Sequence, residues 1–123
     1  MNIERAIVAG RIPVLRLSGE LDLRNVPEVR RAIRGLIDEG QVHFIINLTD
    51  LEFIDSSGLG VLVGGLARVR EKEGTIKLAC NNRRILRVFE MTRLTQLFDI
   101  YDSEETAAQD LLGNGGAAGE NAA

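Results

Sequence analysis

Apolar residues recur along the chain with two different periods, and these periods predict alternating strands and helices. The run from Val42 to Leu48 is almost continuously apolar and rich in β-branched residues, which is typical of a central strand covered on both faces. Apolar residues three and four positions apart predict a helix that begins after Asn25 and ends at Gly40. The same spacing predicts a second helix from about Gly58 to Lys72.

The remaining predicted elements are shorter. They are strands at 3–9, 12–17, 75–79 and 98–101, a connection at 49–54, and helices that begin after Asn81 or Asn82 and after Ser103. The third helix is expected to bury Ile85, Leu86, Val88, Phe89 and Met91. The order β-β-α-β-α-β-α-β-α, with βαβ crossovers, predicts an α/β fold with a mixed, mainly parallel central sheet flanked by about four helices.

The chain divides into one domain and a short tail. Its 123 residues, 45% hydrophobic and 27% charged, are enough for one globular domain, which we place at 1–112. Residues 113–123 are Gly, Ala, Asn and Glu only, so they cannot bury enough apolar surface to offset the entropy of ordering. We therefore expect a flexible Gly/Ala-rich C-terminal tail.

Charge and hydropathy argue against several kinds of partner. Fifteen Lys and Arg are interspersed with 18 Asp and Glu for a net charge of −3, which does not favour nucleic acid or an anionic membrane. The longest apolar stretch, Leu59 to Ala67, is far shorter than the roughly 20 residues of a membrane span. No basic segment leads into an apolar run at the N-terminus, so we expect a cytoplasmic protein without a signal peptide.

The sequence offers few residues for catalysis or metal binding. Its single cysteine, Cys80, and single histidine, His43, exclude an internal disulfide, a cysteine cluster and a multi-histidine metal site. We interpret Cys80 as a buried small hydrophobe and His43 as an ordinary strand residue. No set of residues suited to turnover is visible, so we predict a protein that is not an enzyme and has no metal or cofactor.

The most unusual segment runs from Asp55 to Gly60, where a carboxylate, two adjacent hydroxyls and two glycines stand at the start of a helix. In the simplest interpretation Ser56 or Ser57 caps the helix, while Gly60 and Gly64 let it lie close to the sheet. A dinucleotide-binding loop is disfavoured because the glycine spacing is one residue off G-x-G-x-x-G, and a hydrolase nucleophile elbow lacks G-x-S-x-G. A phosphate on one of these serines would be held by the free N–H groups of the helix N-terminus.

The same segment resembles the signature of the STAS domain in bacterial anti-sigma factor antagonists, and the similarity covers about residues 3–112. The matching segments are Glu52–Leu62, the strand-to-loop element Leu17–Asp22, the central strand Phe44–Leu48, and Leu86–Met91 with Leu94, Leu97 and Phe98. Two positions depart from the family pattern: Arg93 stands where glycine is frequent, and Asn47 stands where many members carry Asp. The resemblance implies the STAS fold.

The resemblance also implies a switch between protein partners. In the family, the serine directly after the Asp is phosphorylated by an anti-sigma factor that is also an ATP-dependent serine kinase; carried over, the acceptor is Ser56. The unphosphorylated antagonist binds the anti-sigma factor and frees the sigma factor, whereas the phosphorylated form lets go. A metal-dependent serine phosphatase resets it. We expect the partner-binding residues to be Asp22, Asp55, Ser57, Gly58, Leu59 and Gly60.

Other features keep two interpretations at this stage. Asp22 is either a turn or cap residue or an acid that steers the kinase's nucleotide-bound magnesium. With Glu20 and Asp55 it would make a phosphorylated site strongly acidic. The cluster Arg83, Arg84 and Arg87 is either a solvated helix face or a docking patch for an acidic partner.

Two alternative functions also remain. One is a STAS scaffold that works without phosphorylation, for example as a subunit of a lipid-transport ATPase. The other is a small nucleotide- or anion-binding module that uses the helix N-terminus. Composition carries no signal for an oligomeric state.

Overall fold

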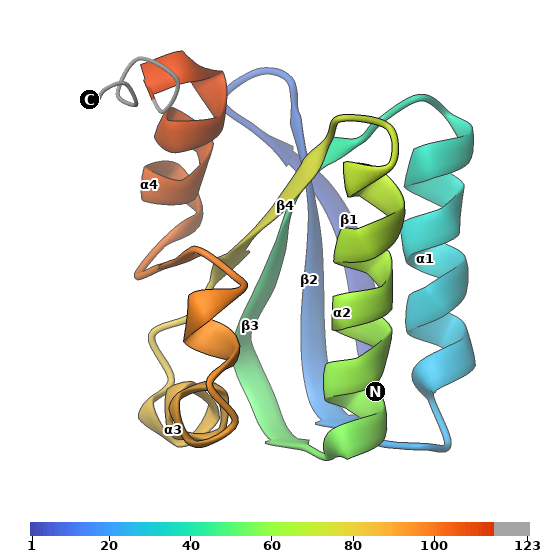
Figure 1. The fold of residues 1–123 in the computed structure, drawn as a ribbon, viewed down its shortest axis with the longest axis vertical. Helices are drawn as coiled ribbons and strands as arrows, with labels where there is room; N and C mark the ends of the chain where they lie inside the picture. Colours follow the sequence, from blue (N-terminus) through green and yellow to red (C-terminus); the bar gives the residue numbers. More distant parts are fainter. Residues whose placement is uncertain (115–123) are drawn as a thin grey trace.

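Five strands form one mixed sheet in the order β1-β2-β3-β4-β5. Figure 1 labels the first four. The computed structural model describes residues 1–114. The strands are β1 (Asn2–Val8), β2 (Ile12–Leu21), β3 (His43–Ile54), β4 (Thr75–Ala79) and β5 (Ile100–Tyr101). β1 pairs antiparallel with β2, and every other neighbouring pair is parallel, which confirms the mixed, mainly parallel sheet.

Four helices flank the sheet, in the predicted order along the chain. They are α1 (Val26–Asp38), α2 (Ser56–Arg70), α3 (Arg83–Met91) and α4 (Glu104–Gln109), with short turns η1 (Leu94–Gln96) and η2 (Asp110–Asn114). α1 and α2 stand side by side and run in the same direction (Figure 1). Within residues 1–114, none of the helices combines the length and hydrophobicity needed to cross a bilayer. Of the predicted tail, residues 115–123 lie outside the described residues.

Alternate residues of β3 enter two separate apolar cores. Phe44, Ile46 and Leu48 are fully buried in the larger core, which also holds the apolar faces of α1, α2 and α3. Ile45 points to the other face, where it packs with Ala107 of α4 in a smaller core. The central strand is therefore covered on both faces, as its continuous apolar run predicts.

The second half of β3 corrects the sequence interpretation. Residues 49–54 were expected to form a connection, but β3 continues to Ile54 because β2 also continues, to Leu21, and pairs with it. The register between the two strands shifts twice, on either side of Ser18 and Gly19. Gly19 has φ +94, a conformation that glycine adopts without strain, so it permits an irregularity rather than ending the strand.

A buried carboxylate fastens α4 to the sheet. Glu104 accepts hydrogen bonds from Arg16 Nε at 2.8 Å and from Asn47 Nδ2 at 2.7 Å. The Arg16 guanidinium holds the pKa of Glu104 below its usual range, although burial acts in the opposite direction. Asn47 is thus a donor to Glu104, whereas an Asp at this position would place a second carboxylate there.

This contact predicts a pH-dependent stability. Because the pKa of Glu104 is lowered in the folded state, its contribution is present above the unfolded pKa of about 4.3 and is lost as the pH falls through the folded value. We expect Glu104→Gln to lower the free energy of unfolding by about 1–2 kcal/mol at pH 7 and by less at pH 3. Urea denaturation at both pH values measures this. The exposed neighbour serves as a control, since Glu105→Gln should change little; an equal loss for Glu104→Gln at both pH values would contradict the prediction.

Candidate functional site

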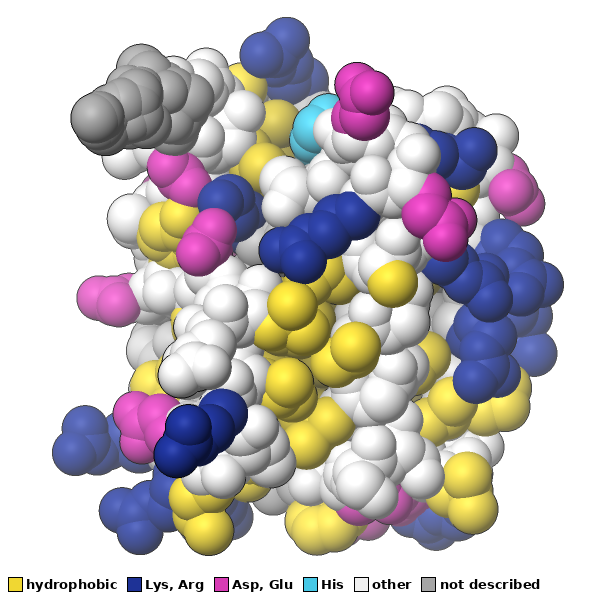
Figure 2. Space-filling model, viewed as in Figure 1, with side chains coloured by type: hydrophobic (Ala, Val, Ile, Leu, Met, Phe, Trp, Pro, Cys, Tyr) yellow, Lys and Arg dark blue, Asp and Glu magenta, His cyan; other side chains and the backbone are white. Residues whose placement is uncertain are grey.

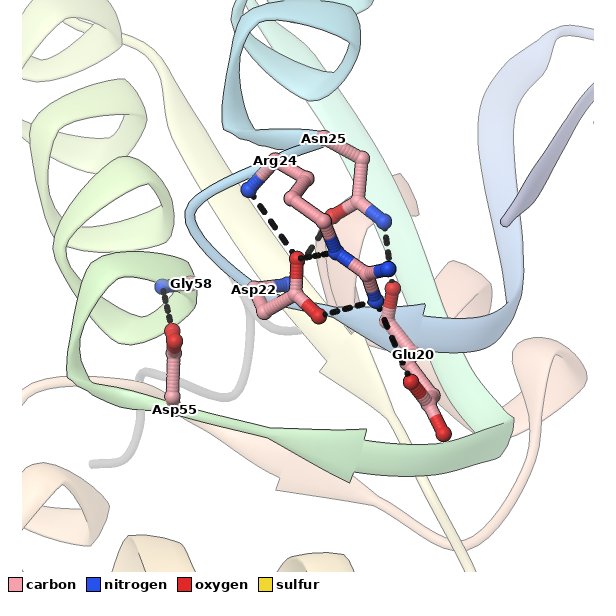
Figure 3. Close-up of polar contacts among 6 residues, drawn as sticks. All are labelled: Glu20, Asp22, Arg24, Asn25, Asp55 and Gly58. Carbon is pink, nitrogen blue, oxygen red and sulfur yellow. Dashed lines mark hydrogen bonds and ion pairs between the residues drawn. The ribbon is translucent and has the colours of Figure 1, made fainter.

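The candidate site lies at the edge of the sheet where β2 and β3 end. Asp22 directly follows β2, and Asp55 directly follows β3. The Asp55 N–H donates to the carbonyl of Leu21 at 3.2 Å, which joins the two strand ends. The loop before α1 and the first turn of α2 are thereby brought together, and the carboxyl edge of a parallel sheet is where α/β proteins usually place their binding sites (Figure 3).

Asp55, and not a serine, caps α2. Its backbone is extended, and its Oδ1 accepts a hydrogen bond from the Gly58 N–H at 2.9 Å. The expectation that Ser56 or Ser57 caps a helix starting near Gly58 is wrong, because β3 reaches Ile54 and α2 begins at once, at Ser56. Aspartate caps a helix about as well as serine does. Both serines are consequently the first two residues of the helix.

The two serines differ in exposure. Ser56 is exposed and Ser57 is half-buried, and neither hydroxyl makes a hydrogen bond within the part of the chain that the structure describes. The first N–H groups of a helix have no partner inside it, and the helix dipole places partial positive charge there. A phosphate on Ser56 would therefore be stabilised by the start of its own helix.

The glycines at this helix start have different roles. A Cβ at Gly58 would lie 2.7 Å from Leu21 Cγ and 3.0 Å from the Leu21 carbonyl oxygen, so glycine is needed for α2 to approach the end of β2. A Cβ at Gly60 or Gly64 would meet nothing within 4 Å. The idea that Gly60 and Gly64 bring the helix close to the sheet is therefore wrong. Gly58 does this at the helix start. Gly65 instead lets α2 approach α1, because a Cβ there would lie 2.9 Å from Ile33 Cδ1.

Leu59 is 9% exposed and packs into the larger core. Among the predicted partner-binding residues, Gly60 is exposed and Asp22, Asp55 and Ser57 are half-buried. Gly58 and Leu59 are buried under the site and support the start of α2. A direct contribution of any of the six residues to partner binding stays a prediction.

The loop after β2 is organised by Arg24, which the sequence interpretation overlooked. Arg24 Nη2 donates to Asp22 Oδ2 at 2.7 Å and to Glu20 Oε1 at 3.3 Å, and Arg24 lowers the pKa of Asp22 (Figure 3). Asn25 Oδ1 accepts from the Asp22 N–H at 2.9 Å instead of capping α1. The expected acidic surface at Glu20 and Asp22 is thus partly neutralised. The sequence could have predicted this pairing, because Arg24 follows Asp22 by two residues and Glu20 by four.

Three large apolar side chains are exposed on the elements around this edge. Leu23 is 72% exposed in the loop after β2, Phe53 is 48% exposed near the end of β3, and Met91 is 76% exposed at the end of α3. Figure 2 shows apolar side chains at the end of the molecule where α2 begins. Met91 was expected to be buried, but Ile85 and Phe89 form the buried face of α3. Residues two positions apart do not share a helix face, so Met91 points away from the core.

α3 carries a basic surface beside the same edge. Asn82 caps the helix and donates through Nδ2 to the Leu51 carbonyl at 2.8 Å, which ties α3 to the second half of β3. Arg83, Arg84 and Arg87 are exposed, and their side chains form no ion pair within the described residues. A docking role for this cluster stays a prediction.

The remaining candidates lie away from the site. His43 is exposed at the first residue of β3, at the opposite end of the strand from Asp55. Cys80 is 3% exposed and burial raises the pKa of its thiol, as expected for a structural cysteine. Arg93 has φ +62, a left-handed conformation that favours glycine, the residue that the resemblance to the STAS domain leads us to expect there. Among residues 1–114 no three His, Cys, Asp or Glu side chains are placed to hold a metal ion.

Comparison with known proteins gives consistent matches over most of the chain. Residues 5–107 match the sequence profile of the STAS domain. The chain is 35% identical over 99 residues to the anti-sigma F factor antagonist of Paenibacillus polymyxa, covering 80% of this chain and 85% of that protein.

Solved structures match as well. The anti-sigma factor antagonist SpoIIAA in its unphosphorylated form superposes with a TM-score of 0.68 at 28% identity, covering 90% of this chain and 97% of that one. The phosphorylated form of the Bacillus cell-fate determinant SpoIIAA gives 0.67 at 28% identity, covering 88% of this chain and 98% of that one.

Proposed function

This chain belongs to the STAS domain family, and we propose that it is an anti-sigma factor antagonist whose binding to an anti-sigma factor is switched off by phosphorylation of Ser56. The observation that carries the proposal is that Ser56 is exposed at the start of α2. Its hydroxyl is not needed to cap the helix, because Asp55 is the cap. Relatives named as antagonists support the function, and a relative with a phosphorylated form supports the switch. Neither alternative function, the scaffold subunit or the anion-binding module, gains support from these relatives.

Exposure favours Ser56 over Ser57 as the acceptor. Phosphoryl transfer requires the attacking hydroxyl oxygen to line up with the γ-phosphate of ATP inside the kinase. Ser56 is exposed at the first helical position, whereas Ser57 is half-buried and faces the side of α1. In the transfer the Ser56 oxygen bonds to the γ-phosphorus, ADP leaves, and the hydroxyl proton passes to the kinase or solvent.

The unphosphorylated site offers an apolar surface for docking. Leu23, Phe53 and Met91 are exposed on the three elements that surround the carboxyl edge, and exposed apolar side chains of this kind mark interaction sites. Phe53 stands three residues before Ser56, and Leu23 lies beside Ser57, so a partner that covers these two side chains would also reach Ser56. The proposed partner is the anti-sigma factor, acting as the serine kinase of the same site.

Phosphorylation would oppose that docking through charge. A phosphoserine adds about −1.5 to −2 charges beside the Asp55 carboxylate. A hundredfold loss of affinity requires only about 2.8 kcal/mol, and like charges brought together in an interface cost several kcal/mol. Since the helix start stabilises the phosphate, the antagonist itself stays folded. We propose that a metal-dependent serine phosphatase removes the group by hydrolysis, which regenerates the hydroxyl and releases phosphate.

Mass spectrometry can locate the acceptor. After incubation with the kinase and ATP, we expect one phosphate on Ser56 in the wild type and in Ser57→Ala, and none in Ser56→Ala. The two variants are matched, since each removes a single hydroxyl from neighbouring positions of the same helix turn. Phosphate on Ser57 alone would show that the acceptor is misassigned.

A further inference from the structure

A groove of about 420 Å³ separates α1 from α2 on the surface of the molecule. Its apolar lining includes Val26, Ile33 and Val61, which are buried from solvent by the surrounding structure. A volume of this size is in the range of surface pockets that accept a few side chains or a small ligand. Nothing in the phosphorylation of Ser56 requires such a groove.

The α2 side of the groove is open because it lacks side chains. Gly60 and Gly64 line it, and a Cβ at either position would meet nothing within 4 Å. Glycine in an exposed helix costs about 1 kcal/mol relative to alanine, so neither residue is explained by packing or by helix stability. Their effect is to leave room for another molecule.

Two unpaired arginines give the groove its charge. Arg30 of α1 and Arg68 of α2 line it, both are exposed, and neither forms a hydrogen bond or ion pair within residues 1–114. By contrast, Arg16 and Arg24 bind carboxylates of their own chain. Figure 2 shows Lys and Arg side chains gathered on the α1 side of the molecule. The groove therefore complements a segment that is apolar on one face and carries Asp or Glu beside it.

The groove is continuous with the site around Ser56. Ser57, the neighbour of the proposed acceptor, lines it, and so does Leu23, one of the three exposed apolar residues at the carboxyl edge. A protein that docks over Ser56 can thus contact the groove as part of the same interface.

We propose that this groove receives an amphipathic acidic segment of the anti-sigma factor that binds at Ser56. The apolar side chains of the segment pack on the exposed Leu23 and on the small exposed parts of Val26 and Val61. Its carboxylates pair with Arg30 and Arg68. The inference rests on the proposed function and extends it by a second point of contact, one that adds affinity and selects among possible partners.

Filling the groove tests the apolar contact. Gly64→Leu places a side chain in open space, so the unfolding temperature should not fall. The affinity for the purified kinase that phosphorylates Ser56, measured with ADP in place of ATP, should fall at least tenfold. Ala67→Leu is the matched control: it adds a leucine to an exposed position of the same helix outside the groove and should bind as the wild type does.

Reversing a charge tests the electrostatic contact. Arg30→Glu should weaken binding at least fivefold at low salt and less at high salt, because the interaction is screened. Arg31→Glu makes the same change one residue along α1, outside the groove, and should have little effect. Wild-type affinity of Gly64→Leu or Arg30→Glu, or an equal loss in the matched control, would overturn the proposal.

Two further outcomes separate the inference from the function on which it rests. If Ser56→Asp abolishes binding while Gly64→Leu and Arg30→Glu bind normally, the proposed function stands and the groove proposal fails. If Gly64→Leu instead removes self-association of this chain without changing affinity for the kinase, the occupant is a second copy and the proposal is overturned.

Discussion

Ser56→Asp is expected to weaken binding of the anti-sigma factor about a hundredfold without unfolding the protein. The new carboxylate would lie at the first position of α2, beside Asp55 and near the exposed side chains of Leu23 and Phe53. A charge buried there by a partner costs several kcal/mol, whereas about 2.8 kcal/mol suffices for a hundredfold loss. An acidic residue in the first turn of a helix is favourable, so the unfolding temperature should stay the same or rise slightly.

The matched control for this change is Ser56→Asn, because the asparagine side chain has nearly the same size as that of aspartate and carries no charge. It should bind within about tenfold of the wild type if charge, and not bulk, controls docking. Isothermal titration calorimetry with the purified anti-sigma factor measures both variants. Equal losses in Ser56→Asp and Ser56→Asn would contradict the electrostatic explanation and leave steric exclusion in its place.

Gly58→Ala is expected to lower the free energy of unfolding by about 1–3 kcal/mol. The added Cβ would lie 2.7 Å from Leu21 Cγ, 2.9 Å from Ile54 Cγ1 and 3.0 Å from the Leu21 carbonyl oxygen. Side chains can turn away from such a contact, but the carbonyl belongs to the strand end that also accepts the Asp55 N–H. The start of α2 must therefore move, and with it the residue that carries the switch.

Gly60→Ala tests whether this loss comes from the contact or from the removal of any glycine. A Cβ at Gly60 meets nothing within 4 Å, so the substitution should raise stability by up to about 1 kcal/mol through helix propensity. Urea denaturation compares the two variants with the wild type. A Gly58→Ala variant as stable as Gly60→Ala would show that the close approach of α2 to β2 is not needed.

Features with local signals were predicted correctly from the sequence. The strand in Val42–Leu48 has a continuous apolar run, and Thr75–Ala79 is bounded by Gly74, so both strands were found. The helix after Asn82 was found because that residue caps it in the usual way. The family resemblance of the segment from Asp55 to Gly60 was confirmed by the comparisons, and Ser56 proved to be exposed.

Features that depend on contacts between distant segments were missed. Residues 49–54 mix polar and apolar side chains, and only their pairing with Ser18–Leu21 makes them a strand. Because β3 extends to Ile54, α2 begins at Ser56 and not near Gly58, and Asp55 becomes its cap. The exposure of Met91 and the pairing of Arg24 with Glu20 and Asp22 likewise depend on how elements meet in space. Periodicity along the chain carries little information of this kind.

The most direct test of the account compares one protein in two chemical states. Wild-type antagonist, phosphorylated by its kinase and verified to carry one phosphate on Ser56, is titrated against the anti-sigma factor beside the unmodified protein. We expect at least a hundredfold weaker binding for the phosphorylated form and full recovery after treatment with a serine phosphatase. Equal affinity of the two forms would contradict it.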